Sequence, residues 1–288
     1  MTRRFTRLGW TAAAFTYLLI VLGAIVRISG SGLGCGEQWP LCRGRLLPPL
    51  DLPTLIEYGH RLTAAAVSLL VLALALTAWW LRRVGPPSER EGVNGPIALS
   101  AELVSERPSA AAYLALGLLV LQVALGAVTV RLRLPPWTVI LHLGTAMLLL
   151  ATLIVAARGP RHVAAAGREL AILGLGFTTV VFGALTANLG AASACLGFPL
   201  CNGRLLPDGN YLQHLQWTHR VLAYALVALV LWWAVRAKRR GPWGVAALLA
   251  LQVVVAAAMV LLARPPALQA AHAAVGTAVW AALVRAAL

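Results

Sequence analysis

The chain has 288 residues, of which 60% are hydrophobic and only 11% are charged, and its mean hydropathy is +0.81. Soluble domains are about 45–50% apolar and about 25% charged, so this composition excludes a water-soluble globular protein and a disordered chain. A formal net charge of +15 would suggest a nucleic-acid partner in a soluble protein. Here the basic residues lie between apolar runs, where they set membrane topology, so we expect no nucleic acid as a partner.

Eight apolar runs are long enough to cross a lipid bilayer, since a spanning helix needs about 20 mostly apolar residues. They lie at 8–28, 60–81, 111–130, 137–157, 170–189, 216–236, 243–263 and 267–286. The first run follows three arginines, as in a signal peptide, but it is longer than a signal-peptide core and no small-residue cleavage site follows it. We interpret it as a retained helix. The sequence therefore predicts an all-α polytopic membrane protein.

The distribution of basic residues predicts the orientation of these spans. Fifteen fall on one side of the membrane: Arg3, Arg4, Arg7, Arg82, Arg83, Arg90, Arg107, Arg158, Arg161, Arg168, Arg236, Lys238, Arg239, Arg240 and Arg285. Six fall on the other side: Arg43, Arg45, Arg131, Arg133, Arg204 and Arg264. Because positively charged loops stay inside, we expect both termini to be cytoplasmic, and the loops 29–59 and 190–215 to be extracytoplasmic, in a cell-membrane protein.

All four cysteines lie in the two loops that are expected to face outward. The outer side of the membrane is oxidising, which favours two local disulfides, Cys35–Cys42 and Cys195–Cys201, although four cysteines allow three pairings. Zinc is the alternative, but neither loop supplies a third and a fourth ligand at zinc-finger spacing.

An internal repeat relates the two halves of the chain. The segment CGEQWPLCRGRLLPPL at 35–50 recurs as CLGFPLCNGRLLPDGN at 195–210, and His60-Arg61 recurs as His219-Arg220 at an offset of 159. The repeat predicts two pseudo-symmetric four-helix bundles, residues 1–160 and 161–288, related by an axis along the membrane normal.

The repeat continues at a smaller offset in the second part of each half. Leu121-Gln122-Val123, a Pro-Pro turn and His142 recur at an offset of 130, where the last of them is His272. The change in offset is absorbed by the 82–110 loop, which shrinks to a few residues at 236–242.

Four of the six histidines form two pairs that match in the repeat, His60/His142 and His219/His272. An ionisable side chain at membrane depth is costly and by default marks a functional site, although a single histidine can also be a hydrogen-bonded packing residue. Two matched pairs on the second and fourth helices of each bundle favour a haem held between helices, ligated from one face or from both. Zinc or copper would also accept imidazole, but each pair lacks the carboxylates or thiols to complete such a site.

The two halves differ near these histidines. Glu57 lies three residues before His60, and its counterpart is Gln216; Arg27 has Ala187 as its counterpart. Two equivalent haems for electron transfer would not require this asymmetry, whereas one reactive haem and one resident haem would. The alternative is that Glu57 only caps its helix.

These residues resemble a known family. The motifs GAIVRISGSGLGC and WPLC within 23–42, EYGHR at 57–61, the cysteine pair at 195–201 and H-x4-HR at 214–220 are similar to those of the haem A synthases, in the bacterial subgroup with extracytoplasmic cysteine pairs. The resemblance covers all eight spans. It implies that the enzyme oxidises the C8 methyl of haem O to a formyl group, by two successive hydroxylations and loss of water from a geminal diol, to give haem A for terminal oxidases.

The resemblance also implies roles for individual residues. His219 and His272 would be the axial ligands of a resident haem B, His60 and His142 the histidines of the substrate-haem site, and Glu57 a catalytic carboxylate. We expect Arg27, Arg61 and Arg220 to pair with haem propionates or other charges. The expected partners are haem O as substrate, haem O synthase and an electron donor.

Two other function classes remain open from the residues alone. A di-haem membrane cytochrome would use both histidine pairs for electron transfer and would not need Glu57. A repeat-based transporter would place its site near the midplane, with broken helices, whereas these histidines lie near the outer ends of their spans.

Overall fold

The computed structural model describes residues 2–38, 40–46, 48–84, 96–158, 167–237 and 239–288, with only the main chain described for 96–109. These residues form α1 (Arg3–Ile28), α2 (Leu52–Val84), α3 (Pro96–Arg131), α4 (Pro136–Arg158), α5 (Gly167–Asn188), the short 3-10 helix η2 (Ala191–Ser193), α6 (Tyr211–Ala237), α7 (Arg240–Leu261) and α8 (Pro266–Ala287). Eight helices in this part of the chain are long and apolar enough to span a membrane, which confirms the predicted all-α polytopic fold.

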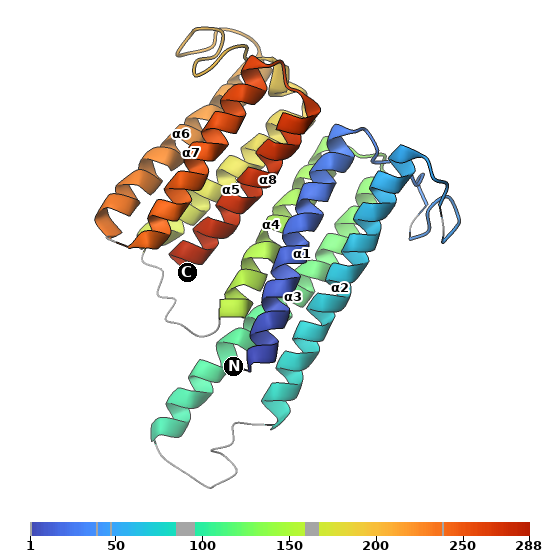
Figure 1. Ribbon diagram of the computed structural model, residues 1–288, viewed down its shortest axis with the longest axis vertical. Coiled ribbons are helices and arrows are strands. Elements are labelled where there is room, and N and C mark those ends of the chain that lie inside the picture. The colour runs from blue at the N-terminus through green and yellow to red at the C-terminus, as the bar shows by residue number, and fades with distance from the viewer. Residues whose placement is uncertain (1, 39, 47, 85–95, 159–166, 238) are drawn as a thin grey trace.

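The helices form two four-helix bundles that stand side by side, α1 to α4 and α5 to α8 (Figure 1). Between the bundles α1 packs against α8, as α5 packs against α4, and α4 also contacts α8. In the repeat, α5 corresponds to α1 and α4 corresponds to α8. The α1–α8 and α5–α4 contacts are therefore related by a pseudo-two-fold axis between the halves. The expected boundary at residue 160 lies outside the described residues.

Matching side chains fill the contact between the bundles. The hydroxyl of Tyr17 on α1 donates to the carbonyl of Ala274 on α8 at 3.1 Å. At the corresponding place, Phe177 on α5 lies against Gly144 on α4, where an added Cβ would be 3.7 Å from the ring. Trp280 on α8 is buried in the core of the first bundle. The core of the first bundle therefore extends across the contact to α8, whereas the second bundle keeps a core of its own.

The repeat extends to unusual backbone conformations. All six non-glycine residues with positive φ in the described part of the chain form matched pairs: Arg43 with Asn202, Arg133 with Ala263, and Leu134 with Arg264. Left-handed conformations are uncommon for non-glycine residues. Their recurrence at the repeat offsets therefore supports the homology of the two halves independently of the helix pattern.

The helices begin earlier than their apolar runs. Residues 96–110, expected in a loop, are helical in α3, and α2 begins at Leu52 rather than near residue 60. Hydropathy marks only the membrane-crossing part of a helix, and a polar cap sets the start of α2. The carboxylate of Asp51 accepts from the hydroxyl of Thr54 at 2.7 Å and from its amide at 3.1 Å, and these bonds hold the pKa of Asp51 below its ordinary value. Arg90, Arg161, His162, Lys238 and the side chain of Arg107 lie outside the described part.

Candidate functional site

The structure brings together both predicted histidine pairs. His60 on α2 and His142 on α4 lie near each other inside the first bundle, as do His219 on α6 and His272 on α8 inside the second. All four residues are half-buried and lie in the part of their helices nearest the cysteine loops or the Pro-Pro turns. His214, which has no partner in the repeat, is exposed at the start of α6.

Glycines on neighbouring helices make room for three of the four imidazoles. A Cβ added at Gly23 would lie 3.2 Å from Cε1 of His60, and one at Gly126 would lie 3.2 Å from Cε1 of His142. At Gly183, the repeat counterpart of Gly23, the distance to Cε1 of His219 would be 2.9 Å. Real Cβ atoms avoid such distances, so larger residues would push the rings away from their present positions.

The rings differ in what holds Nδ1. In the second bundle, Nδ1–H of His219 donates to the carbonyl of Thr179 at 3.1 Å. In the first bundle the corresponding carbonyl, that of Leu19, lies near His60 but outside hydrogen-bond geometry, and Nδ1 of His60 is buried without a partner among the described residues.

A glutamine contacts the other histidine of each pair. The amide Nε2 of Gln122 on α3 lies 3.1 Å from Nε2 of His142. Its repeat counterpart, Gln252 on α7, lies 3.1 Å from Nδ1 and 3.3 Å from Nε2 of His272, and donates to the carbonyl of His272 at 3.1 Å. In both glutamines Oε1 is buried and has no partner within the described part of the chain.

These donors fit a haem better than a bare metal ion. Zinc sites need three or four protein ligands, and the described residues contain no cluster of three His, Cys, Asp or Glu side chains that could hold a metal. Each bundle has a pair of neighbouring imidazoles, and glycines leave space beside three of the four rings. In the first bundle, Nδ1 of both rings is buried without a partner among the described residues. Such donors suit a planar group ligated between helices. The residues present therefore fit a haem.

Both expected disulfides are present. Cys35 is bonded to Cys42 and Cys195 to Cys201, and each disulfide lies beside a small bridge of main-chain hydrogen bonds, Cys42 with Arg45 and Cys201 with Arg204. All four cysteines are buried. The disulfides therefore close two compact loops of the same design.

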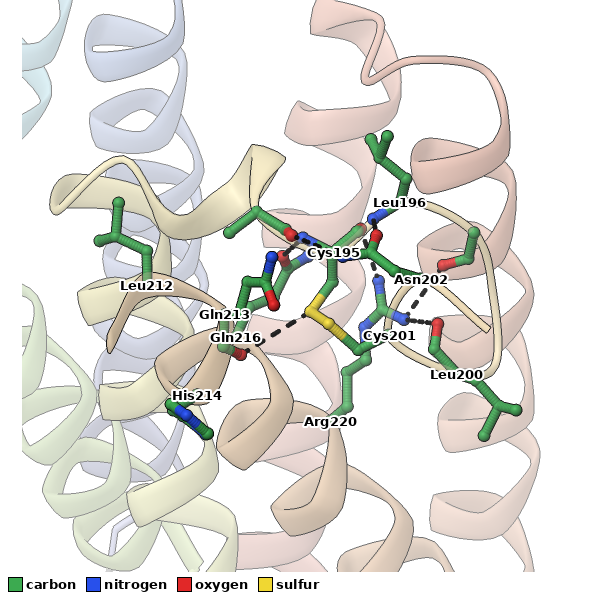
Figure 2. The surroundings of a disulfide bond; sticks show 12 residues. Cys195, Leu196, Leu200, Cys201, Asn202, Leu212, Gln213, His214, Gln216 and Arg220 are labelled. Carbon is green, nitrogen blue, oxygen red and sulfur yellow. Dashed lines mark hydrogen bonds between the residues drawn. A yellow bond between two sulfur atoms is a disulfide. The ribbon is translucent and has the colours of Figure 1, made fainter. Parts of the chain in front are cut away.

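An arginine next to the first histidine of each pair anchors the loop above it. Figure 2 shows Arg220 extending beneath the second cysteine loop. Its guanidinium donates to the carbonyls of Cys195 at 3.1 Å and Leu200 at 2.8 Å. In the first half, Arg61 donates to the carbonyls of Gln38 and Leu41.

The predicted catalytic carboxylate, Glu57, is buried beneath the first cysteine loop. Its Oε2 accepts from the main-chain N–H of Cys35 at 2.7 Å, and its Oε1 pairs with Arg61 at 2.5 Å. The alternative that Glu57 caps α2 is wrong, because the helix begins five residues earlier, at Leu52, and Asp51 caps it.

The three predicted arginines have partners within the protein. Arg61 forms an ion pair with Glu57, and Arg220 donates hydrogen bonds to main-chain carbonyls of the second cysteine loop. Arg27 on α1 reaches the carbonyl of Ala187 on α5 at 3.5 Å, so it links the two bundles. Glu57 is paired with Arg61 and not with Arg27.

Several residues that line the site were not among those predicted from the sequence. Gln122 and Gln252 stood out only as members of the repeated Leu-Gln-Val, although a glutamine in an apolar span is itself a signal. Gly23 and Gly183 also match in the repeat. The carbonyl of Thr179 had no signal, because main-chain acceptors leave no mark in a sequence.

Comparison with known proteins finds relatives over most of the chain. A family model described as COX15-CtaA, cytochrome oxidase assembly protein, matches residues 6–284. The chain is 34% identical to a protein named heme A synthase from Symbiobacterium thermophilum, over 83% of this chain and 80% of that protein. It is 31% identical to the heme A synthase of Geobacillus kaustophilus, over 88% and 82%, and 29% identical to that of Bacillus licheniformis, over 83% and 78% of the two chains.

Proposed function

Because this chain belongs to the COX15-CtaA family of cytochrome oxidase assembly proteins and is an oxidoreductase that converts haem O to haem A, we propose that its two bundles hold different haems. The first bundle takes haem O, the substrate, between His60 and His142. The second bundle holds haem B, the resident cofactor, with His219 and His272 as axial ligands.

The contact between His219 and Thr179 carries this assignment. A metal-bound histidine usually donates its second ring N–H to a fixed acceptor, which orients the ring and strengthens the ligand. Nδ1–H of His219 already has such an acceptor at 3.1 Å, whereas His60 has none in hydrogen-bond geometry among the described residues. A fixed ring suits a cofactor that stays, and a freer ring suits a substrate that enters and leaves.

The reaction is the oxidation of the C8 methyl of haem O to a formyl group, through two hydroxylations and the loss of water from the resulting geminal diol. Haem B, when bound, passes electrons between an external redox partner and the substrate site. The protein's own part is to orient the substrate with His60 and His142.

Glu57 gives the substrate bundle a carboxylate beneath the cysteine loop, where the other bundle has the neutral Gln216. Glu57 lies one helical turn before His60, and the residue is 3% exposed, so solvent screens its carboxylate poorly. We assign it the stabilisation of positive charge that develops as the methyl carbon is oxidised. Its partner Arg61 holds the carboxylate in place and ties it to the cysteine loop.

The cysteine loops face outward and both termini face the cytoplasm in this proposal. Tryptophans paired with arginines lie toward the other end of the bundles: the guanidinium of Arg83 is 4.0 Å from the ring centre of Trp79, and that of Arg285 is 5.9 Å from Trp10. Tryptophans gather at membrane interfaces and basic residues on the cytoplasmic side, which supports this orientation. The partners are haem O synthase, which delivers the substrate, and an electron donor.

Haem extraction from the purified protein tests the proposal. The protein is expressed with haem O synthase, and extracted haems are separated by chromatography and identified by their pyridine haemochrome spectra. We expect haem B together with haem A or its hydroxylated precursor. Haem B alone, with added haem O left unchanged under reducing and aerobic conditions, would reject the enzyme and leave a membrane cytochrome.

A further inference from the structure

The hydroxyl of Thr186 on α5 is buried and has no hydrogen-bond partner among the described residues, and Thr186 is only 7% exposed. Other threonines inside the helices donate to the carbonyl four residues earlier, at 2.7–2.9 Å: Thr16, Thr63, Thr77, Thr129, Thr145, Thr152, Thr179, Thr218 and Thr277. For Thr186 that acceptor would be the carbonyl of Phe182, and no such bond is formed. Because a buried hydroxyl without a partner costs free energy, its orientation needs an explanation.

Thr186 lies on the face of α5 that holds His219. The carbonyl of Thr179 is 3.1 Å from Nδ1 of His219, and Gly183 makes room for the same ring. Thr186 follows Gly183 by three residues, so the two share one face of the helix. Side chains also tilt toward the N-terminus of their helix, which for Thr186 is toward the ring. The hydroxyl is therefore beside the proposed haem B site, on the side of the second cysteine loop.

The first bundle has no hydroxyl at this position. The repeat counterpart of Thr186 is Val26, at the same offset of 160 that relates Gly23 to Gly183. Valine has the shape of threonine without the hydroxyl, so helix packing at this place does not require threonine. The extra hydroxyl falls in the bundle that we assign to haem B.

The surroundings of Thr186 are positively charged. Arg27 reaches the carbonyl of Ala187, the next residue, at 3.5 Å, and Arg264 reaches a carbonyl of η2 at 3.4 Å. Arg220 lies beneath the cysteine loop at the same end of the bundle. These three guanidiniums donate to main-chain carbonyls, and none forms an ion pair with a carboxylate in the described part of the chain. This place therefore favours an anionic acceptor.

We propose that the hydroxyl of Thr186 donates a hydrogen bond to a propionate carboxylate of haem B. This inference rests on the proposed placement of haem B between His219 and His272. An ionised carboxylate is costly in hydrocarbon, so the propionates of a haem held near the outer ends of the helices turn toward the loops. The carboxylate supplies the acceptor that Thr186 lacks, and the neighbouring guanidiniums offset its charge.

Replacement by a residue of the same shape tests the proposal. Thr186→Val removes the hydroxyl and copies Val26, whereas Thr186→Ser keeps a hydroxyl. Transfer of haem B from the purified holoprotein to excess apomyoglobin should be about 10- to 100-fold faster for Thr186→Val, the value of a hydrogen bond to a charged group, and close to the parent rate for Thr186→Ser. Thr152→Val is the control and should match the parent, because that hydroxyl bonds only to the carbonyl of Leu148 in its own helix.

Resonance Raman spectroscopy gives a second readout that does not depend on turnover. The bending band of the haem propionates responds to their hydrogen bonds, so it should shift in Thr186→Val and stay in place in Thr186→Ser. All variants are expressed without haem O synthase and also carry His60→Ala, which removes a histidine of the first bundle. Haem B in the second bundle is then measured alone.

Two results would overturn the inference. Haem transfer at the parent rate from Thr186→Val, with the propionate band unchanged, would show that the hydroxyl makes no bond to haem B. Faster transfer with an unchanged band would show that Thr186 only packs the site. If Thr186→Val does not fold, Thr186→Ala gives the same comparison. Retention of haem B by both His219→Ala and His272→Ala would instead reject the proposed function itself.

Discussion

Glu57 and Gln216 occupy the same place in the two halves, and each accepts a hydrogen bond of 2.7 Å from the main-chain N–H of the first cysteine in the loop above it. The amide of Gln216 also donates to the carbonyl of Ala192, which a carboxylate cannot do. Glu57 pairs with Arg61 instead. Either side chain can thus anchor the cysteine loop. What distinguishes the first half at this position is the negative charge of Glu57.

Glu57→Gln separates the anchor from the charge. The variant should fold, keep its Cys35–Cys42 disulfide and hold haem B, because Gln216 performs the same anchoring in the second half. Haem A formation should fall by about 100-fold, or stop at the hydroxylated haem, since the charge that stabilises the oxidised carbon is lost. Chromatography of extracted haems measures both. Conversion at the parent rate would leave Glu57 as a loop anchor only.

The axial ligands can be tested by alanine substitution in each bundle. His219→Ala and His272→Ala should lose most of the haem B, because in the proposed site both histidines hold the haem. His60→Ala and His142→Ala should keep haem B and lose conversion of haem O. Haem content and the reduced absorption spectrum are the readouts. Full haem B in either second-bundle variant, with an unchanged spectrum, contradicts the assignment.

The disulfides should be formed in protein isolated without reductant. Thiol counting on the unfolded chain should find no free cysteine, and peptide mapping should find Cys35 with Cys42 and Cys195 with Cys201. Replacing Cys35 and Cys42 by serine should lower stability by about 2–3 kcal/mol, the entropic value of so small a loop. Thermal unfolding in detergent checks the magnitude. Four free thiols would refute the prediction.

The space that Gly183 leaves for the ring of His219 can be tested with a matched pair of alanine variants on α5. Gly183→Ala would place a Cβ 2.9 Å from Cε1 of His219 and should displace the ring, at a cost of about 1–3 kcal/mol and with loss of haem B. Gly174→Ala on the same helix meets nothing within 4 Å and should be neutral or stabilising. Equal haem content in the two variants would show that the notch has no role in holding the imidazole.

The sequence predicted the parts of this protein that have a side-chain signature and a repeat. The eight spans follow from the length of the apolar runs, and the two histidine pairs follow from the cost of imidazole at membrane depth. Both disulfides follow from the oxidising outer side of the membrane, where the cysteine loops are expected to lie. The anchoring of the loops by Arg61 and Arg220 did not follow, because their acceptors are main-chain carbonyls. Nor did the start of α2, where a polar cap precedes the apolar run.

The pairing of Tyr17 with Ala274 and of Phe177 with Gly144 bears on how the molecule arose. In a symmetric homodimer each surface meets the same surface of its partner, so every contact occurs twice. The α1–α8 and α5–α4 contacts have that form, and at these positions they differ by a phenolic hydroxyl and a methyl group. They are what we expect if two copies of an ancestral four-helix protein dimerised before their genes were fused. Once both copies shared one polypeptide, each could diverge without disturbing the other, and an ancestor with two equivalent pockets could become an enzyme with two unlike ones.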